Sequence, residues 1–216
     1  METVLQHDVP AAREARMAWA AGGALDTTGV CPWALQSSAE RAYHDREWGR
    51  PLHDERALFE FLCLEGAQAG LSWRTILGKR PHYRAVFDDF DVERVARYDL
   101  EKVERLMRDP GIVRNRLKIE AVVANARACL AMRGAGTSFG EWMWTQVDGR
   151  PLVGGWREPR SVPPSSALST RISTDLRRRG FRFVGPVVIQ SFMKATGMIN
   201  AHLVGCPQHD ECRRAA

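Results

Sequence analysis

The hydrophobic positions of the chain repeat at helical spacing, most clearly over residues 54–66. Leu58, Phe61 and Leu62 lie three and four residues apart, as on one face of an α-helix, and most neighbouring positions are apolar too. A helix that is apolar on nearly all sides is buried. Glu65 falls on the same stripe, so the pattern predicts that its carboxylate is carried into the interior. A buried carboxylate needs a fixed partner or a ligand that supplies one.

Helical spacing also accounts for most of the remaining chain. Helix starts are marked by residues that favour N-caps and first turns: Asp54, Asp91, Asp99, Ser138 and Pro186. Apolar stripes follow these starts and predict further helices over residues 119–130, 169–179 and 186–197. No stretch shows convincing strand alternation. The pattern therefore predicts an all-α fold.

Length and composition are those of a globular protein. The 216 residues carry 31 Lys and Arg against 26 Asp and Glu, and the formal charge of +5 permits binding to a polyanion without requiring it. Nothing in the chain has the pattern of a secretion signal or a membrane span. We expect residues 1–28 to be a flexible extension, residues 29–207 to be one domain and residues 208–216 to be a C-terminal tail.

The five cysteines are an odd number, and no secretion signal precedes them. This usage indicates a reducing, cytoplasmic location, in which cysteines are thiols or metal ligands rather than disulfides. Cys63 and Cys129 lie on apolar helical faces and are expected to be buried thiols.

The other cysteines lie near histidines. Cys31 and His44 are 13 residues apart, and His202 and Cys206 are four residues apart. Two sulfurs and two imidazoles suit a closed, tetrahedral and therefore structural zinc site. The spacing is not that of a standard zinc finger, so rival ligands stay open. They are His53, His209 and Cys212.

The residues after the buried acid have the features of a pocket. Gly66 and Gly70 let a backbone approach a ligand closely, Gln68 offers an amide, and Trp73 offers a flat stacking surface. Together with Glu65 they suit a flat ligand that is cationic or donates hydrogen bonds, such as a nucleobase. The alternative is that Glu65 pairs with one of the 27 arginines and that Trp73 is a core residue.

A second constellation lies between two predicted helices. Pro110 and Gly111 form a turn, and three cations follow: Arg114, Arg116 and Lys118. Gly111 would let hairpin N–H groups reach a phosphate, and a helix N-terminus favours negative charge. The pattern suits a helix-hairpin-helix contact to a DNA backbone. A Pro-Gly turn near arginines is also common in proteins that bind no DNA.

These residues belong to motifs of one known family. The matching segments, in chain order, are Tyr43-His44-Asp45, Glu47-Trp48-Gly49, Cys63-Leu64-Glu65-Gly66, Gln68 to Trp73, Phe87, Asp109 to Ala126, Arg179-Gly180-Phe181, Phe183-Val184-Gly185 and His202 to Cys206. From about Cys31 to Cys206 the chain resembles the constitutive 3-methyladenine DNA glycosylases (type I). The resemblance implies a helix-hairpin-helix glycosylase fold in which zinc joins the N- and C-terminal parts.

The resemblance also implies roles for the site residues. The family's zinc ligands match Cys31, His44, His202 and Cys206, and its hairpin matches Pro110, Gly111, Arg114, Arg116 and Lys118. The resemblance implies that Glu65 accepts hydrogen bonds from a flipped 3-methyladenine and favours its positive charge. It places Tyr43, Trp48 and Trp73 against the base, and Gln68, Gly70 and Leu71 on the loop that fills the gap in the duplex.

The implied reaction is hydrolytic excision from double-stranded DNA by a monomer, without lyase activity, as the first step of base excision repair. Residues 111–132 contain no aspartate, as in similar relatives that lack the catalytic Asp of other helix-hairpin-helix glycosylases. No lysine is expected near the pocket, which argues against Schiff-base chemistry. One departure is Glu40, where the family often has a second tyrosine, so an altered lesion preference is an alternative. A non-catalytic zinc-containing DNA-binding module and a zinc hydrolase unrelated to DNA are others.

Overall fold

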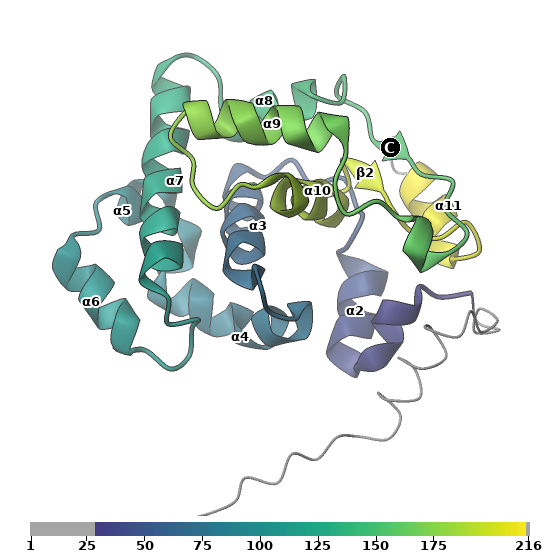
Figure 1. Cartoon of the computed structure of the whole chain (residues 1–216), viewed down its shortest axis with the longest axis horizontal. Helices are drawn as coiled ribbons and strands as arrows, with labels where there is room; N and C mark the ends of the chain where they lie inside the picture. Colours follow the sequence, from purple (N-terminus) through teal and green to yellow (C-terminus); the bar gives the residue numbers. More distant parts are fainter. Residues whose placement is uncertain (1–28, 215–216) are drawn as a thin grey trace, which may run out of the picture.

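The computed structural model describes residues 29–214, which form a helical assembly with one very small sheet (Figure 1). The flexible extension expected for residues 1–28 lies outside the described residues. The α-helices are α2 Ser38–Arg46, α3 Glu55–Gln68, α4 Trp73–Val86, α5 Val92–Ala96, α6 Leu100–Arg108, α7 Arg116–Gly134, α8 Phe139–Thr145, α9 Ala167–Arg178, α10 Pro186–Ala195 and α11 Pro207–Arg214. The 3-10 segments are η1 Pro32–Gln36, η2 Asp88–Phe90 and η3 Pro159–Ser161.

The predicted helix starts are confirmed. The side chains of Asp54, Asp91 and Asp99 each accept a hydrogen bond from the backbone N–H three residues later. Ser138 and Glu141 form the expected capping box. The fold is mostly helical as predicted, but two short strands, β1 Leu152–Val153 and β2 Ile199–Asn200, pair in parallel. Strands of two residues are too short to show an alternating pattern, so no periodicity could predict them.

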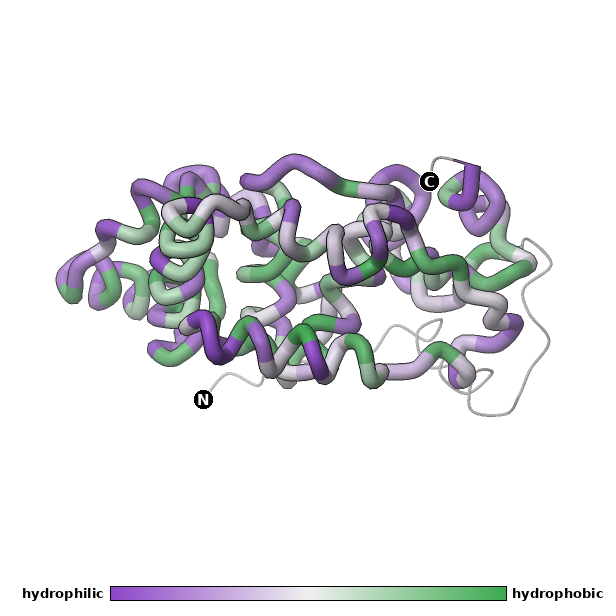
Figure 2. The backbone as a smooth tube through the Cα atoms, turned by 90° about the horizontal axis from the view of Figure 1, so that it is seen from above, coloured by the Kyte–Doolittle hydropathy of each residue, from purple (hydrophilic) through white to green (hydrophobic). Residues whose placement is uncertain are grey.

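Helix α3 is the central element. Every residue from Leu58 to Ala67 is buried, including Glu65, whose residue is only 5% exposed. The helix continues two residues beyond the predicted end at Gly66 and packs against α4, α7, α8 and α10. Figure 2 shows hydrophobic and hydrophilic positions mixed along the surrounding helices, as expected of helices with one buried face. The prediction that a carboxylate enters the interior is therefore confirmed.

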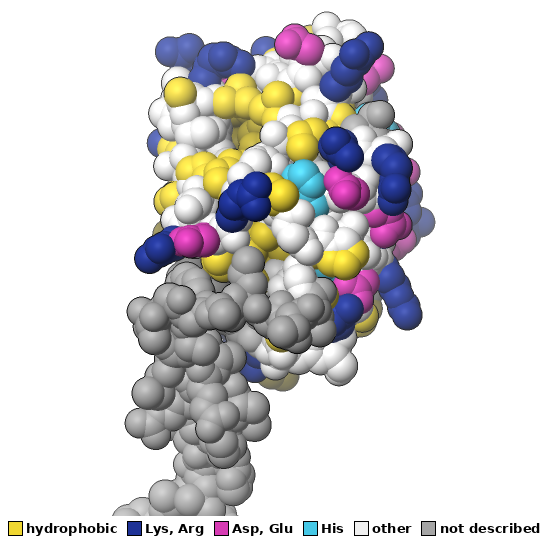
Figure 3. Space-filling model, turned by 90° about the vertical axis from the view of Figure 1, so that its right-hand side faces the viewer, with side chains coloured by type: hydrophobic (Ala, Val, Ile, Leu, Met, Phe, Trp, Pro, Cys, Tyr) yellow, Lys and Arg dark blue, Asp and Glu magenta, His cyan; other side chains and the backbone are white. Residues whose placement is uncertain are grey.

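The C-terminal segment closes one end of the molecule. The residues expected to form a tail lie mostly in helix α11, where His209 and Cys212 are buried and Arg50 pairs with Glu211 at 2.8 Å. On the face that includes this end, cationic and acidic side chains are interspersed over the visible surface (Figure 3). Among the helices of the described residues, none is long and apolar enough to span a lipid bilayer.

A buried ion-pair network links the central helix α3 to the neighbouring helices. Arg80 of α4 donates to Glu60 of α3 and pairs with Glu47, both at 2.6 Å, and Arg84 also reaches Glu60. Arg80 and Glu60 are nearly inaccessible to solvent. The guanidinium also lies over the ring of Phe61, with 4.8 Å between its carbon and the ring centroid. The network thus joins α3, α4 and the end of α2.

We expect Arg80→Met to lower the free energy of unfolding by about 3 kcal/mol, because it leaves Glu60 buried with one partner fewer. Urea denaturation followed by circular dichroism measures the effect. The matched control is Arg97→Met, which breaks the exposed pair with Glu93 and should change stability by less than about 1 kcal/mol. Equal effects in the two variants would contradict a structural role for the network.

Candidate functional site

A cavity of about 220 Å³ lies where α2, α3, α4 and α10 meet. Its lining contains aromatic, acidic and amide side chains that are distant in the sequence. They are Trp33, Glu40, Tyr43, Trp48, Glu65, Gln68, Trp73, Ser191 and Lys194. The structure therefore brings together the four side chains that the sequence analysis placed around a base, and adds others to them.

Aromatic rings form two walls of this cavity. The Tyr43 and Trp73 ring centroids are 5.2 Å apart, and those of Trp33 and Trp48 are 5.0 Å apart. Tyr43 Oη and Trp73 Nε1 are buried and have no hydrogen-bond partner among the described residues. Because buried polar atoms are normally satisfied, these two groups are available to a molecule that enters the cavity.

Glu65 places an ionisable carboxyl group inside the cavity. Its carboxylate forms no hydrogen bond or ion pair with any side chain or backbone group of residues 29–214. Burial raises the pKa of Glu65 to about 8, and the positive charge of Lys194 offsets part of that rise. An acidic group that lacks a protein partner inside a cavity is suited to a ligand that donates hydrogen bonds or carries positive charge.

Glu40, at the position where the family often has tyrosine, is not a second free carboxylate. Its Oε2 accepts hydrogen bonds from Arg74 Nε at 3.0 Å and from the Ser37 hydroxyl at 2.8 Å. Arg74 in turn donates to the backbone oxygen of Gln36. The ion pair therefore neutralises Glu40 and ties the start of α4 to the start of α2 at the edge of the cavity.

Lys194 corrects one expectation. No lysine was expected near the pocket, yet Lys194 of α10 lines the cavity, and burial lowers the pKa of its ammonium. Trp33 and Ser191 were also missed. Ser191 and Lys194 are three residues apart on a helix that is otherwise largely apolar, so their common polar face was a usable signal. Trp33 gave no signal beyond its nearness to Cys31.

The predicted duplex-contacting loop is the turn between α3 and α4, residues 69–72. Gly70 has φ +80°, a backbone conformation that favours glycine, and Leu71 is 43% exposed. Gln68, which was predicted to belong to this loop, is instead the last residue of α3 and lines the cavity. The turn therefore projects an exposed leucine beside the cavity.

The hairpin, residues 109–115, lies between α6 and α7. The Gly111 N–H donates to the Asp109 carboxylate at 2.7 Å, and Lys79 donates to the Pro110 carbonyl at 2.8 Å. The predicted route of a phosphate to the Gly111 N–H is thus occupied by an internal contact. Arg114 is exposed and forms no ion pair within residues 29–214, whereas Arg116 pairs with Glu104.

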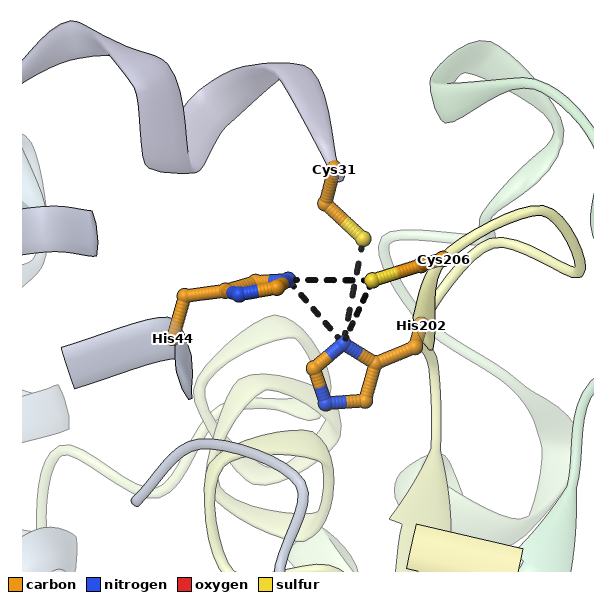
Figure 4. A group of neighbouring side chains, drawn as sticks. All are labelled: Cys31, His44, His202 and Cys206. Atoms are coloured by element: carbon orange, nitrogen blue, oxygen red, sulfur yellow. Dashed lines mark hydrogen bonds between the residues drawn. The ribbon is translucent and has the colours of Figure 1, made fainter. Parts of the chain in front are cut away.

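A third group of side chains lies at the junction of the N- and C-terminal parts. Cys31, His44, His202 and Cys206 are all buried and point toward one another (Figure 4). Their ligand atoms lie within 4.8 Å of one another. His44 Nε2 is 3.1 Å from His202 Nδ1 and 3.5 Å from Cys206 Sγ, and both sulfurs are 3.8 Å from His202 Nδ1.

These separations fit the edges of a tetrahedron around a metal. Zinc–ligand distances imply edges of about 3.3 Å between two nitrogens and about 3.5 Å between nitrogen and sulfur. The outer ring nitrogens are also held: His44 Nδ1 lies 2.8 Å from Asp45 Oδ1, and His202 Nε2 lies 3.1 Å from the Trp48 carbonyl oxygen. Such contacts orient histidine ligands. The hydrogen bond between the two thiols raises the pKa of Cys31 and lowers that of Cys206, and contacts with both imidazoles lower the latter further. The cluster therefore favours a thiolate at Cys206.

The rival ligands do not join this cluster. His209 Nε2 contacts the Gly154 carbonyl oxygen at 2.8 Å, and His53 is exposed and stacks on Trp144. Cys212 is buried in α11 outside the four-residue group. His202 and Cys206, which are four residues apart, lie on a turn between β2 and α11. The preferred set of four is therefore confirmed as a cluster.

Comparison with known proteins gives consistent matches over most of the chain. A family profile described as methyladenine glycosylase matches residues 33–209. DNA-3-methyladenine glycosylase 1 of Escherichia coli is 47% identical over 176 residues, covering 82% of this chain and 94% of that protein. The structure of 3-methyladenine DNA glycosylase I from Staphylococcus aureus, described as the basis of 3-methyladenine recognition, is 38% identical and has a TM-score of 0.82, with coverages of 85% and 98%.

A further solved structure is that of a single-residue variant of a 3-methyladenine DNA glycosylase I in complex with 3-methyladenine. It is 38% identical to this chain and has a TM-score of 0.81, with coverages of 84% of this chain and 97% of that one.

Proposed function

The chain belongs to the methyladenine glycosylase family, and we infer that it hydrolyses the N-glycosidic bond of 3-methyladenine in alkylated DNA, the first step of base excision repair. The observation that supports this inference is the buried carboxyl group of Glu65, which has no hydrogen-bond or ion-pair partner within residues 29–214 and lies in a cavity walled by aromatic rings. A neutral substrate would gain little from this arrangement. A cationic purine gains both charge stabilisation and stacking.

The cavity residues act on the leaving base. A 3-methylated adenine in DNA is cationic, so its bond to the sugar is already weak and little acid catalysis is required. We propose that Glu65 accepts hydrogen bonds from the base edge, while Tyr43, Trp48 and Trp73 pack against the ring. Water adds to the sugar carbon C1′ and loses a proton, and the base departs with the electron pair of the broken bond.

The base must leave the duplex to reach this cavity. We propose that Leu71 fills the gap that it leaves, with Gly70 allowing the sharp turn and Gln68 contacting the base from inside the cavity. The hairpin holds the backbone through its exposed surface, with Pro110 and Gly111 at its tip. Arg114, which is exposed and forms no ion pair within residues 29–214, is the hairpin cation that we propose for a phosphate. Arg116 can contribute only by sharing its guanidinium with Glu104.

We propose that the four-residue cluster binds one zinc ion. Cys31, His44, His202 and Cys206 fill all four positions of a tetrahedral shell, so the ion is structural and joins the two ends of the domain. A zinc hydrolase needs an open position for water, which this ligand set does not provide. The two sulfurs and two imidazoles, and the contacts that hold the outer ring nitrogens of both histidines, support this assignment.

Because Lys194 lines the cavity, the predicted absence of lyase activity needs an experimental test. A lyase would form a Schiff base between a lysine and the sugar C1′, and borohydride would trap it as a covalent protein–DNA adduct. We expect wild-type protein to create alkali-labile abasic sites in methylated duplex DNA without a trapped adduct. An adduct lost in Lys194→Met would assign lyase activity to that residue, and absence of abasic sites would favour a non-catalytic DNA-binding module.

We further propose that the protein acts as a monomer on double-stranded DNA in the cytoplasm. The five cysteines are all unpaired and buried, which suits a reducing compartment. The cavity, the turn and the hairpin are all supplied by one chain.

The Glu65 carboxyl predicts a pH dependence. With a pKa raised to about 8, Glu65 is mostly neutral at pH 6 and becomes a carboxylate as the pH rises. Since the charged form favours a cationic base, kcat/KM should rise about tenfold between pH 6 and 7 and level off above about pH 8. Lys194→Met removes the charge that lowers this pKa, so its profile should shift to higher pH. A flat wild-type profile between pH 6 and 9 would contradict the assignment.

A further inference from the structure

Lys118 reaches from the hairpin's second helix to the end of the central helix. It lies in the first turn of α7, where its backbone N–H donates to the N-cap Asn115. Its Nζ donates to the backbone oxygen of Ala67 at 2.8 Å and to that of Ala69 at 2.6 Å. These carbonyls belong to the C-terminal end of α3, which has no further intrahelical donors and is the negative end of the helix dipole.

The two carbonyl groups that accept from Lys118, those of Ala67 and Ala69, lie at the start of the turn formed by residues 69–72. Within residues 29–214, no other side chain from outside this segment donates a hydrogen bond to its backbone oxygens. The turn itself is short, with the Leu71 N–H donating to the Gln68 oxygen at 2.6 Å. Glu65 precedes the turn on α3, and Trp73 follows it as the first residue of α4. Lys118 therefore fixes the connection between two walls of the cavity.

We propose that Lys118 is a positioning residue that couples the hairpin to the turn, rather than a phosphate ligand. This role rests on the proposed glycosylase function. When the hairpin contacts the DNA backbone, Lys118 sets where Leu71 and the cavity mouth lie relative to that backbone. Two of its three N–H donors are used by protein carbonyls, and burial lowers the pKa of its ammonium, as for a cation partly removed from solvent.

The two roles predict different effects of the substitution Lys118→Met. A phosphate ligand neutralises one DNA charge, so its loss weakens binding to all duplexes and reduces the salt slope of log Kd by about 1. A positioning residue leaves that slope unchanged and instead slows the step that needs the turn in place. Misplacement of a reacting group by about 1 Å lowers a rate by about 100-fold.

The experiment combines three measurements on Lys118→Met, Lys118→Arg and the control Lys102→Met. The control alters a half-buried lysine of α6 whose Nζ lies 4.8 Å from the ring centroid of Tyr98. The measurements are the single-turnover rate of 3-methyladenine release, duplex Kd against salt, and binding of free 3-methyladenine by tryptophan fluorescence. We expect Lys118→Met to release base at least tenfold more slowly, with the salt slope and the free-base affinity unchanged. Lys118→Arg should recover part of the rate, and the control should match wild type.

A salt slope reduced by about 1, or a wild-type rate in Lys118→Met, would overturn the proposal. If Lys118→Met does not fold, the Lys118→Arg variant decides alone. If Lys118 binds a phosphate, the arginine variant should keep the wild-type release rate and salt slope. If Lys118 is a positioning residue, the arginine variant should release base more slowly than wild type. Failure of wild-type protein to release base would instead refute the proposed function, and the two failures are thus distinguishable.

Discussion

Glu65→Gln is expected to lower kcat/KM for 3-methyladenine release by about 100-fold or more. The amide keeps the size of the side chain but removes the negative charge that faces the base. The aromatic walls and the turn are unchanged, so binding to undamaged duplex should stay close to that of wild type. The loss should appear in both kcat and kcat/KM if the charge acts mainly as the bond breaks.

The same substitution should stabilise the folded protein at high pH. The pKa of Glu65 is about 8 when folded and 4.5 when unfolded, so the folded state favours the neutral form. The contribution to stability is fully present below pH 4.5 and is lost as the pH rises through 8. Glutamine never ionises, so we expect the variant to be about 2–4 kcal/mol more stable than wild type at pH 9.

Thermal unfolding at pH 5 and pH 9 tests this stability difference alongside the activity assay. The matched control is Glu93→Gln, an exposed carboxylate on α5, which should change neither quantity appreciably. Wild-type activity in Glu65→Gln would remove this residue from the site. Loss of activity together with loss of stability would mean instead that Glu65 has a structural partner.

Cys31→Ser is expected to remove the bound zinc and to lower the thermal midpoint by roughly 10 °C. Cys31 comes from the start of the described chain, while His202 and Cys206 come from its C-terminal part, so losing one ligand releases the connection between them. A stability loss of about 3 kcal/mol corresponds to that shift in a chain of this size. Turnover measured well below the midpoint should stay within severalfold of wild type, because the metal shell is closed to substrate.

Metal analysis by mass spectrometry gives the zinc content of each variant. Cys129→Ser is the matched control, since Cys129 is equally buried but lies on α7 outside the cluster, and it should retain one zinc per chain. A stable, zinc-replete Cys31→Ser would refute the ligand set. Complete loss of turnover in a folded variant would indicate that the metal takes part in the reaction.

Features set by local sequence were the ones that could be predicted. The N-caps at Asp54, Asp91 and Asp99 depend on a side chain and a backbone group three residues apart. The burial of Glu65 follows from a helix that is apolar on nearly every face. The four cluster residues were selected among several histidines and cysteines only because the family resemblance named them, since the spacing alone left rivals open.

Features that depend on contacts distant in sequence could not be predicted. Lys194 comes near Glu65 only because α10 packs on α3. The pairing of Glu40 with Arg74 and that of Lys118 with the end of α3 join residues 34 or more positions apart. Each contact changes the role expected of a residue. Arg74 neutralises Glu40, and protein carbonyl groups occupy the ammonium group of Lys118. No periodicity or propensity carries that information.

The most direct test of the account is the identity of the bases that wild-type protein releases from methylated duplex DNA, separated by chromatography. A cavity in which the Glu65 carboxyl group lies between aromatic walls predicts release of free 3-methyladenine while 7-methylguanine stays in the DNA. Equal release of both bases would contradict a selective cavity. No release by folded, zinc-loaded protein would contradict the proposed function itself.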